Sequence, residues 1–311
     1  MIPDLLALVG GLALLMAAAT ALVRGAASLA LRLGLSPLVV GLTVVAFGTS
    51  APELVVSVQA ALAGAGGIAV GNVVGSNIAN VGLILALAVL VRPIATDPTV
   101  LRRDLPVLLA TTVAVSVLLL DGQLGALEGA GLIAALLAYL AWSVRQARRD
   151  SAEATLPVAE PGPVWRDAAL VAGGLGGLVL GADLFVGGAV ALAEGAGVSN
   201  AVIGLTVVAV GTSLPELATS VVAAARGEGE LAVGNVVGSN VFNLLGILGI
   251  GAIVRPLVAP GLQVVDLAVM AAFAAVLVPM MVSGRRLVRP EAMVLLAAYV
   301  GYIGYLAVLH G

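Results

Sequence analysis

Apolar residues fill most of this chain in runs long enough to cross a lipid bilayer. A transmembrane helix needs about 20 predominantly apolar residues at 1.5 Å each. On that basis the first half of the chain contains five predicted spans, near residues 4–23, 36–63, 68–91, 104–120 and 124–144. The second half has the same pattern, with predicted spans near residues 168–191, 199–225, 230–253, 263–283 and 289–308. We therefore expect an all-α integral membrane protein with ten transmembrane helices.

Polar residues interrupt this pattern mainly in one segment between the two halves. The stretch DSAEATLPVAEPGP, residues 150–163, is polar and contains prolines, as a flexible linker does. We divide the chain into a first five-helix repeat over residues 1–149, a short cytoplasmic linker over 150–165 and a second repeat over 166–311. Charged residues at the predicted span ends, such as Asp104, are expected to be solvated at the membrane interface.

The positions of the arginines predict the orientation of the chain. All 14 basic residues are arginines, and with the N-terminus outside every one except Arg255 falls on the cytoplasmic side. Basic residues concentrate on the cytoplasmic side of membrane proteins. The first apolar run has no positive segment before it, which argues against a cleaved signal peptide. We predict a multi-pass protein of the cell (inner) membrane with both termini outside the cytoplasm.

One 40-residue stretch occurs twice in the chain. Residues 41–80 and 204–243 align without a gap at an offset of 163, and 28 of the 40 positions are identical. Internal duplication of this length indicates a fold built from repeats. Because each repeat contains an odd number of predicted spans, the two copies would enter the membrane in opposite directions, as an inverted-topology repeat.

Composition and charge exclude several functional classes. The chain is 61% hydrophobic and 10% charged, with a mean hydropathy of +1.18, which is too apolar for a soluble protein. A net charge of −3 gives no basic surface for nucleic acid, and the absence of cysteine excludes thiolate chemistry. The only histidine is His310, near the end of the chain, so no serine–histidine pair can be assembled and we expect no enzyme.

Each repeat carries one carboxylate in apolar surroundings, Glu53 in GTSAPE and Glu216 in GTSLPE. Such an acid at bilayer depth costs between about 3 and more than about 10 kcal/mol, so a functional reason is expected. The preceding prolines, Pro52 and Pro215, should open the helices and free backbone carbonyls beside the glutamates. Carboxylates, carbonyls and hydroxyls together favour Ca²⁺ or Na⁺.

The motif GNVVGSN follows each glutamate and adds further polar side chains. Its glycines let helices approach closely, and packing alone could explain them. The serines and asparagines near mid-membrane add oxygen ligands: Ser76, Asn77 and Asn80 in the first repeat, and Ser239, Asn240 and Asn243 in the second. Asn72 and Asn235 are equally compatible with satisfying backbone groups.

The paired GTSxPE and GNxxGSNxxN motifs resemble the α-repeats of the sodium/calcium exchanger family, within the cation/calcium antiporter superfamily. The resemblance extends over all ten predicted spans and is greatest for the short prokaryotic members. It implies exchange of Ca²⁺ for Na⁺ by alternating access, with the first and sixth helices sliding across the core. The calcium ligands that it implies are Glu53 and Glu216 with the carbonyls of Thr49 and Thr212. The sodium ligands that it implies are Ser50, Ser76, Ser213 and Ser239, the carbonyls of Ala46 and Ala209, and the same threonines.

One position departs from the family pattern. Asn243 stands where the second repeat of the best-known members commonly has an aspartate, so Asn80 and Asn243 make the site symmetric with two acids only. An asparagine offers a neutral oxygen, as a protonated aspartate would, and both asparagines are kept as candidate ligands. H⁺/Ca²⁺ exchange and, less favourably, a cation channel stay open as alternatives. We expect no cofactor beyond the transported ions Ca²⁺ and Na⁺, a lipid bilayer as the surroundings, and function as a monomer.

Overall fold

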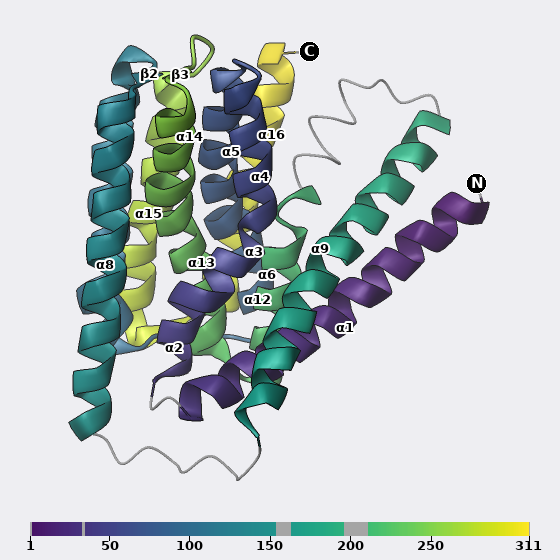
Figure 1. Ribbon diagram of the computed structural model, residues 1–311, viewed down its shortest axis with the longest axis vertical. Helices are drawn as coiled ribbons and strands as arrows, with labels where there is room; N and C mark the ends of the chain where they lie inside the picture. Colours follow the sequence, from purple (N-terminus) through teal and green to yellow (C-terminus); the bar gives the residue numbers. More distant parts are fainter. Residues whose placement is uncertain (1, 33–34, 154–162, 196–210, 311) are drawn as a thin grey trace.

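The computed structural model describes residues 2–32, 35–153, 163–195 and 211–310, and nearly all of its elements are helices (Figure 1). Those of the first half are α1 (Ile2–Arg32), α2 (Pro37–Val40), α3 (Ala46–Thr49), α4 (Ala51–Leu62), α5 (Gly66–Ala79), α6 (Ala86–Val91), α7 (Leu105–Leu118) and α8 (Ala126–Glu153). Those of the second half are α9 (Val164–Gly195), α12 (Leu214–Arg226), α13 (Gly229–Phe242), α14 (Leu248–Val254), α15 (Val264–Val282) and α16 (Arg289–His310).

Wider, π-helical turns join several of these helices into longer rods. They cover Gly41–Val45 between α2 and α3, Asn80–Leu85 between α5 and α6, Val100–Asp104 before α7, and Asn243–Ile247 between α13 and α14. Such π-helical turns are rare and are frequently found at functional sites. Two of them begin at a candidate ligand, Asn80 or Asn243.

The all-α prediction is confirmed, and the protein is an integral membrane protein. Among the described residues, eight helices are long and apolar enough to cross a membrane, or up to nine if the bent pair over residues 38–62 is one span. The predicted span 199–225 is described only from residue 211 onward. The count of ten therefore stays a prediction.

Several helices are longer than their predicted spans. The predicted span 4–23 lies within α1, which continues to Arg32, and 168–191 lies within α9, which covers Val164–Gly195. Hydropathy marks only the apolar part of a helix, whereas the backbone hydrogen bonds continue into its polar end. The ends of these two helices are joined by an ion pair between Arg32 and the buried Asp167.

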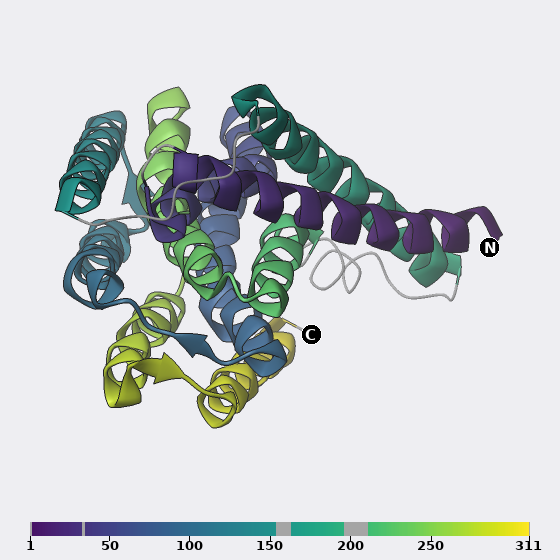
Figure 2. The ribbon, with the colours of Figure 1, turned by 90° about the horizontal axis from the view of Figure 1, so that it is seen from below.

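Helices α1 and α9 run side by side and lean away from the other helices (Figures 1 and 2). Helix α1 contains one pair of adjacent glycines and α9 contains three, and in each pair the second glycine faces the other helix. A Cβ atom at Gly174 would lie 2.8 Å from both the backbone nitrogen and the Cβ of Leu22, and one at Gly11 would lie 2.5 Å from the backbone nitrogen of Phe185. A Cβ at Gly173 or Gly10 would meet no described atom within 4 Å. These small residues let the two backbones approach closely.

This contrast predicts different outcomes for two adjacent substitutions. Gly174→Leu should lower the free energy of unfolding by about 1–3 kcal/mol or more, because a side chain there must displace the backbone of α1. Gly173→Leu is the matched control and should leave stability nearly unchanged. Thermal unfolding of both variants in detergent measures the difference. Equal destabilisation by the two substitutions would contradict this helix pairing.

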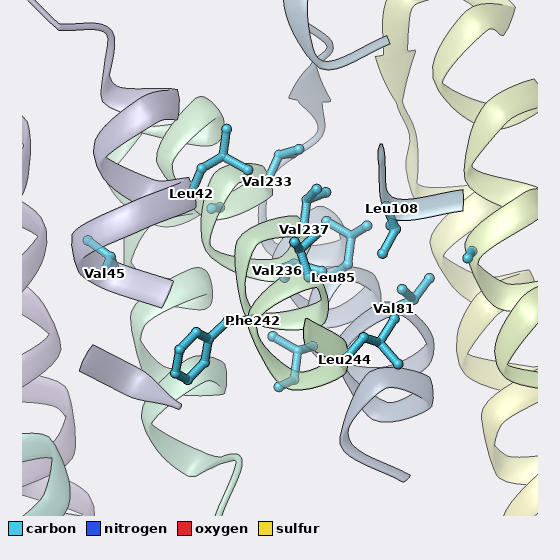
Figure 3. Close-up of a cluster of buried hydrophobic side chains, with 14 of the residues drawn as sticks. Leu42, Val45, Val81, Leu85, Leu108, Val233, Val236, Val237, Phe242 and Leu244 are labelled. Carbon is cyan, nitrogen blue, oxygen red and sulfur yellow. The ribbon is translucent and has the colours of Figure 1, made fainter. Parts of the chain in front are cut away.

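Helix α13 forms the centre of the core (Figure 3). Every residue of α13 from Leu231 to Phe242 is buried. Its valines lie between side chains of the two helical segments of the first half that flank it: Leu42 and Val45 on one side, Val81 and Leu85 on the other. A Cβ at Gly238 would lie 2.6 Å from the carbonyl oxygen of Leu42, so packing accounts for this glycine of the GNVVGSN motif.

Two short strand pairs link the two halves. Strand β1 (Ile94–Ala95) pairs antiparallel with β4 (Arg286–Leu287), and β2 (Gln123–Leu124) pairs antiparallel with β3 (Leu257–Val258). Figure 1 shows β2 and β3 at the top of the bundle, and the view from below in Figure 2 shows the other pair.

Two arginines also connect the halves, each at the end of a helix in the opposite half. Arg255, the one arginine that the sequence predicts outside the cytoplasm, donates from Nη1 to the carbonyl oxygen of Leu62 at 3.2 Å. Its guanidinium lies beside Gly64, whose φ of +78° ends α4. Arg92 lies in the same way beside Gly227, whose φ is +86°. A cation at a helix C-terminus is favourable, so Arg255 and Arg92 each have a structural role at the helix end that they contact.

The prediction that Asp104 is solvated is wrong. This residue is 3% exposed and accepts a hydrogen bond from the hydroxyl of Tyr139 at 3.1 Å. The corresponding pair in the second half is Asp266 and Tyr302, with a distance of 2.8 Å. The position of Asp104 at the end of a predicted span did not indicate that it is buried, because its partner Tyr139 lies on α8, 35 residues away.

Candidate cation-binding site

The first glutamate follows a break in the helix that carries it. Helix α3 ends at Thr49, Ser50 has φ −80° and ψ 8°, and α4 begins at Ala51 with a bend of 47°. Pro52 in the first turn of α4 has no N–H to donate to the preceding turn, which is the physical cause of the break. The expected opening near Pro52 is confirmed. Glu53 therefore lies in the first turn of α4, where the positive end of the helix dipole favours a carboxylate.

The second glutamate occupies the equivalent place in the other half. Ser213 has φ −89° and ψ 8°, α12 begins at Leu214, and Pro215 and Glu216 lie in its first turn. Both glutamates are 1% exposed. Two helix N-termini thus present a buried carboxylate each.

Two crossed hydrogen bonds join the carboxylates to the opposite halves of the chain. The hydroxyl of Ser50 donates to Oε1 of Glu216 at 2.8 Å, and the hydroxyl of Ser213 donates to Oε1 of Glu53 at 3.0 Å. Each glutamate is thereby oriented by the serine at the other helix break. The second oxygen, Oε2, of each glutamate is buried and has no hydrogen-bond partner among the described residues.

Asn72 and Asn235 bind the backbone at the two glutamates. The amide nitrogen of Asn72 donates to the carbonyl oxygen of Glu53 at 3.3 Å and to Ser57 Oγ at 3.0 Å. Asn235 makes the equivalent bonds to Glu216 and Ser220, at 3.4 and 3.0 Å. These asparagines form hydrogen bonds to backbone groups, which is one of the two roles that the sequence analysis left open for them.

Most of the other predicted ligands are also buried, and they belong to the same two copies of the repeated stretch as the glutamates. Thr49, Ser76, Ser239, Asn80 and Asn243 are each no more than 5% exposed. Ala46 is also buried, and its carbonyl oxygen accepts hydrogen bonds from Ser50 N at 3.0 Å and Thr49 Oγ1 at 3.4 Å. Ala209 lies outside the described residues.

Several buried oxygens of these residues have no hydrogen-bond partner in the part of the chain that the structure describes. They are Oε2 of Glu53 and Glu216, Oδ1 of Asn80 and Asn243, and the hydroxyls of Thr212 and Ser239. A buried polar atom without a partner is costly and calls for an explanation. All six are hard oxygen atoms, two of them on carboxylates, which is the ligand chemistry that Ca²⁺ and Na⁺ prefer. Among the described residues, no group of three or more acids, histidines or cysteines is placed so that it could hold a metal ion. The two glutamates give the candidate site a charge of −2 when both are ionised.

The sequence identified the two glutamates and the hydroxyls, but it did not predict that each serine bonds the glutamate of the other half. It also did not identify Thr219 of α12, which is fully buried and whose hydroxyl has no hydrogen-bond partner within the described part of the chain. Its counterpart at the 163-residue offset is Val56, so the repeat pattern gave no signal for this hydroxyl.

Comparisons with known proteins agree on one family. The sodium/calcium exchanger protein family matches residues 4–145 and again residues 167–308, so both halves match the same family. The putative antiporter CaxA of Alkalimonas amylolytica is 40% identical over an alignment of 310 positions, and the match covers 94% of this chain and 95% of the relative. The sodium/calcium exchanger MaX1 of Methanosarcina acetivorans is 34% identical, with 96% and 97% of the two chains covered.

A solved structure also matches along almost the whole chain. The sodium-calcium exchanger NCX_Mj, in a crystal soaked with Na⁺ and Ca²⁺, is 33% identical, and the match covers 98% of each chain with a TM-score of 0.87.

Proposed function

The chain belongs to the sodium/calcium exchanger family, and from this premise we propose that it exchanges Ca²⁺ for Na⁺ by alternating access at Glu53 and Glu216. Membership of the family supports a cation/Ca²⁺ antiporter in general. The proposal adds the coupling ion, the site and the transport mechanism.

The observation that carries the proposal is the pair of crossed serine–glutamate hydrogen bonds. They connect the two halves of the chain directly at the carboxylates and leave Oε2 of each glutamate for a cation. A Ca²⁺ ion bound between the glutamates would neutralise both charges. An empty site with two buried charges would be very costly to carry past hydrocarbon, whereas a loaded site is close to neutral. Only loaded states should then change access, which makes the exchange obligatory.

We propose ligand roles for each candidate residue. Ca²⁺ is bound by both glutamates and by the carbonyls of Thr49 and Thr212. Na⁺ is bound by the same threonines, by the carbonyls of Ala46 and Ala209, and by the hydroxyls of Ser50, Ser76, Ser213 and Ser239. The neutral side-chain oxygens of Asn80 and Asn243 contribute to the site for either ion. Coordination by the Ala46 carbonyl would require the Thr49 hydroxyl to release it, because this carbonyl already accepts two hydrogen bonds.

We propose that α1 and α9 move as one unit when access changes. They pack against each other along their lengths and are joined at one end by the ion pair of Arg32 and Asp167. Both views show them inclined to the remaining helices rather than parallel to them (Figures 1 and 2). This arrangement supports a sliding pair on a fixed core.

An inverted repeat of five spans each, with both termini outside the cytoplasm, completes the proposal. It is supported by strand β3 of the second half, which lies at the top of the bundle in Figure 1, whereas the equivalent β1 of the first half lies at the other end. We place the protein in the cell (inner) membrane, active as a monomer.

The driving ion is tested by Ca²⁺ uptake into proteoliposomes. An outward Na⁺ gradient at equal pH should drive radiolabelled Ca²⁺ uptake, and an outward proton gradient in sodium-free buffer should drive little. Hydroxyls and carbonyls solvate Na⁺ but do not carry protons near neutral pH. The double variant Ser76→Ala/Ser239→Ala should lose most sodium-driven uptake.

Each competing mechanism gives a different result in the same assay. Full uptake driven by protons alone, unaffected in the serine variant, would establish H⁺/Ca²⁺ exchange instead. Uptake that follows the Ca²⁺ gradient without any counter-ion would indicate a channel. Acidification on both sides should inhibit sodium-driven uptake, because protonation of Glu53 or Glu216 removes a ligand for both ions.

A further inference from the structure

Four asparagines form a closed network where α5 meets α13, and they continue into the π-helical turns that follow these helices. Asn77, Asn80, Asn240 and Asn243 are each no more than 2% exposed. Asn77 and Asn240 donate from Nδ2 to each other's backbone carbonyl oxygens, at 3.3 and 3.4 Å. Asn80 donates from Nδ2 to Oδ1 of Asn240 at 2.8 Å, and Asn243 donates to Oδ1 of Asn77 at 3.0 Å.

The two backbone carbonyls determine which way every amide in this network points. A carbonyl oxygen can only accept a hydrogen bond, so the side chain of Asn240 must present its nitrogen to Asn77 O. Oδ1 of Asn240 then faces Asn80. This oxygen can only accept in turn, so Asn80 must present its nitrogen to it.

This orientation determines which atom the two outer asparagines, Asn80 and Asn243, leave without a hydrogen bond in the network. Because Nδ2 of Asn80 is turned toward Asn240, Oδ1 lies on the other branch of the amide, and this buried oxygen has no hydrogen-bond partner among the described residues. In the same way, the bond from Asn243 to Asn77 leaves Oδ1 of Asn243 without a partner in the part of the chain that the structure describes. An amide turned the other way would present N–H groups, which repel a cation.

We propose that Asn77 and Asn240 are positioning residues that keep the oxygens, and not the nitrogens, of Asn243 and Asn80 available to the transported cation. Each outer asparagine is oriented by an asparagine of the opposite half of the chain. Asn77 and Asn240 are therefore not ligands through their side-chain oxygens, contrary to the expectation from the sequence, because those oxygens already accept hydrogen bonds. This inference rests on the proposed function.

A double-mutant cycle on Ca²⁺ binding tests the inference. The variants are Asn77→Ala, Asn243→Ala and the two combined, and the measurement is the Ca²⁺ concentration at half-maximal thermal stabilisation of the purified protein. Asn77→Ala should weaken apparent Ca²⁺ affinity by about tenfold, on the order of one lost polar interaction. The double variant should bind no more weakly than Asn243→Ala alone, because Asn77 acts only through Asn243.

A second cycle provides the matched control. Asn77 and Asn80 lie on the same helical segment, but the side-chain oxygen of Asn77 orients Asn243, whereas Asn80 is oriented by Asn240. The effects of Asn77→Ala and Asn80→Ala on affinity should therefore multiply, to about 100-fold in the double variant. A purely structural role of Asn77 would lower the unfolding temperature in every background without this dependence on the partner.

Multiplying effects for Asn77 and Asn243 would overturn the inference. If Asn77→Ala fails to give a monodisperse protein, Asn77→Ser takes its place, because serine stays polar but is too short to reach Asn243 Nδ2. The symmetric cycle of Asn240 with Asn80 gives an independent result. If Ca²⁺ stabilises the wild-type protein but the effects of the paired substitutions on affinity multiply, this inference alone is refuted. If Ca²⁺ neither stabilises the wild-type protein nor is transported by it, the proposed function is refuted as well.

Discussion

Ca²⁺ transport is expected to fall by more than about 100-fold when either Glu53 or Glu216 is replaced by glutamine. Each substitution removes half of the charge that faces a divalent ion. Two unit charges 4 Å apart interact by about 4 kcal/mol at an effective dielectric constant of about 20, and the interaction with Ca²⁺ is larger. Even a partial loss of that energy exceeds the roughly 2.7 kcal/mol that corresponds to 100-fold.

Folding should survive these substitutions. A glutamine oxygen can still accept the hydrogen bond that Ser213 or Ser50 donates, and one buried charge is removed. The unfolding temperature in detergent should therefore not fall. Sodium-driven Ca²⁺ uptake into proteoliposomes measures the loss of transport.

Asp183→Asn is the matched control for the glutamate variants. Asp183 is also an acid within an apolar helix, α9, but its side chain is exposed. Its neutralisation should leave uptake near the wild-type rate. Uptake at the wild-type rate by Glu53→Gln or Glu216→Gln would refute the two-carboxylate site.

The second large effect is the labelling of equivalent positions from opposite sides of the membrane. Ala63 at the end of α4 and Ala225 near the end of α12 are both exposed and occupy nearly equivalent places in the two halves. In an inverted repeat, a cysteine at Ala63 should react with an impermeant thiol reagent only from outside, and one at Ala225 only from the cytoplasm. Ala63 is a better labelling position than Gly66 at the start of α5, because a Cβ at Gly66 would lie 2.5 Å from the backbone nitrogen of Val258.

The control for this experiment is the natural protein, which contains no cysteine and should not be labelled. A permeant reagent should label both variants, which shows that each thiol is accessible. Labelling of both positions from the same side would rule out the inverted arrangement.

The sequence by itself determined the class of protein and most of the candidate site. Apolar runs require a membrane, because so much apolar surface cannot be buried within a soluble chain of this length. The duplication at an offset of 163 identified both glutamates, and the prolines at the adjacent positions predicted the helix breaks that the structure has near Ser50 and Ser213. These features depend on residues close together in the chain, where local chemistry decides the structure.

Helix ends and burial near them were less predictable. Hydropathy did not extend α1 to Arg32 and placed Asp104 in solvent, because it records neither backbone hydrogen bonds nor the approach of Tyr139. The tertiary structure alone decided how the two halves meet. It paired Ser50 with Glu216 and Asn243 with Asn77, residues that are 166 positions apart. It also fixed the direction of the asparagine amides. A repeated motif gives the same residues to both halves, but which side chain bonds which depends on the docking of one half against the other, and no local pattern encodes that contact.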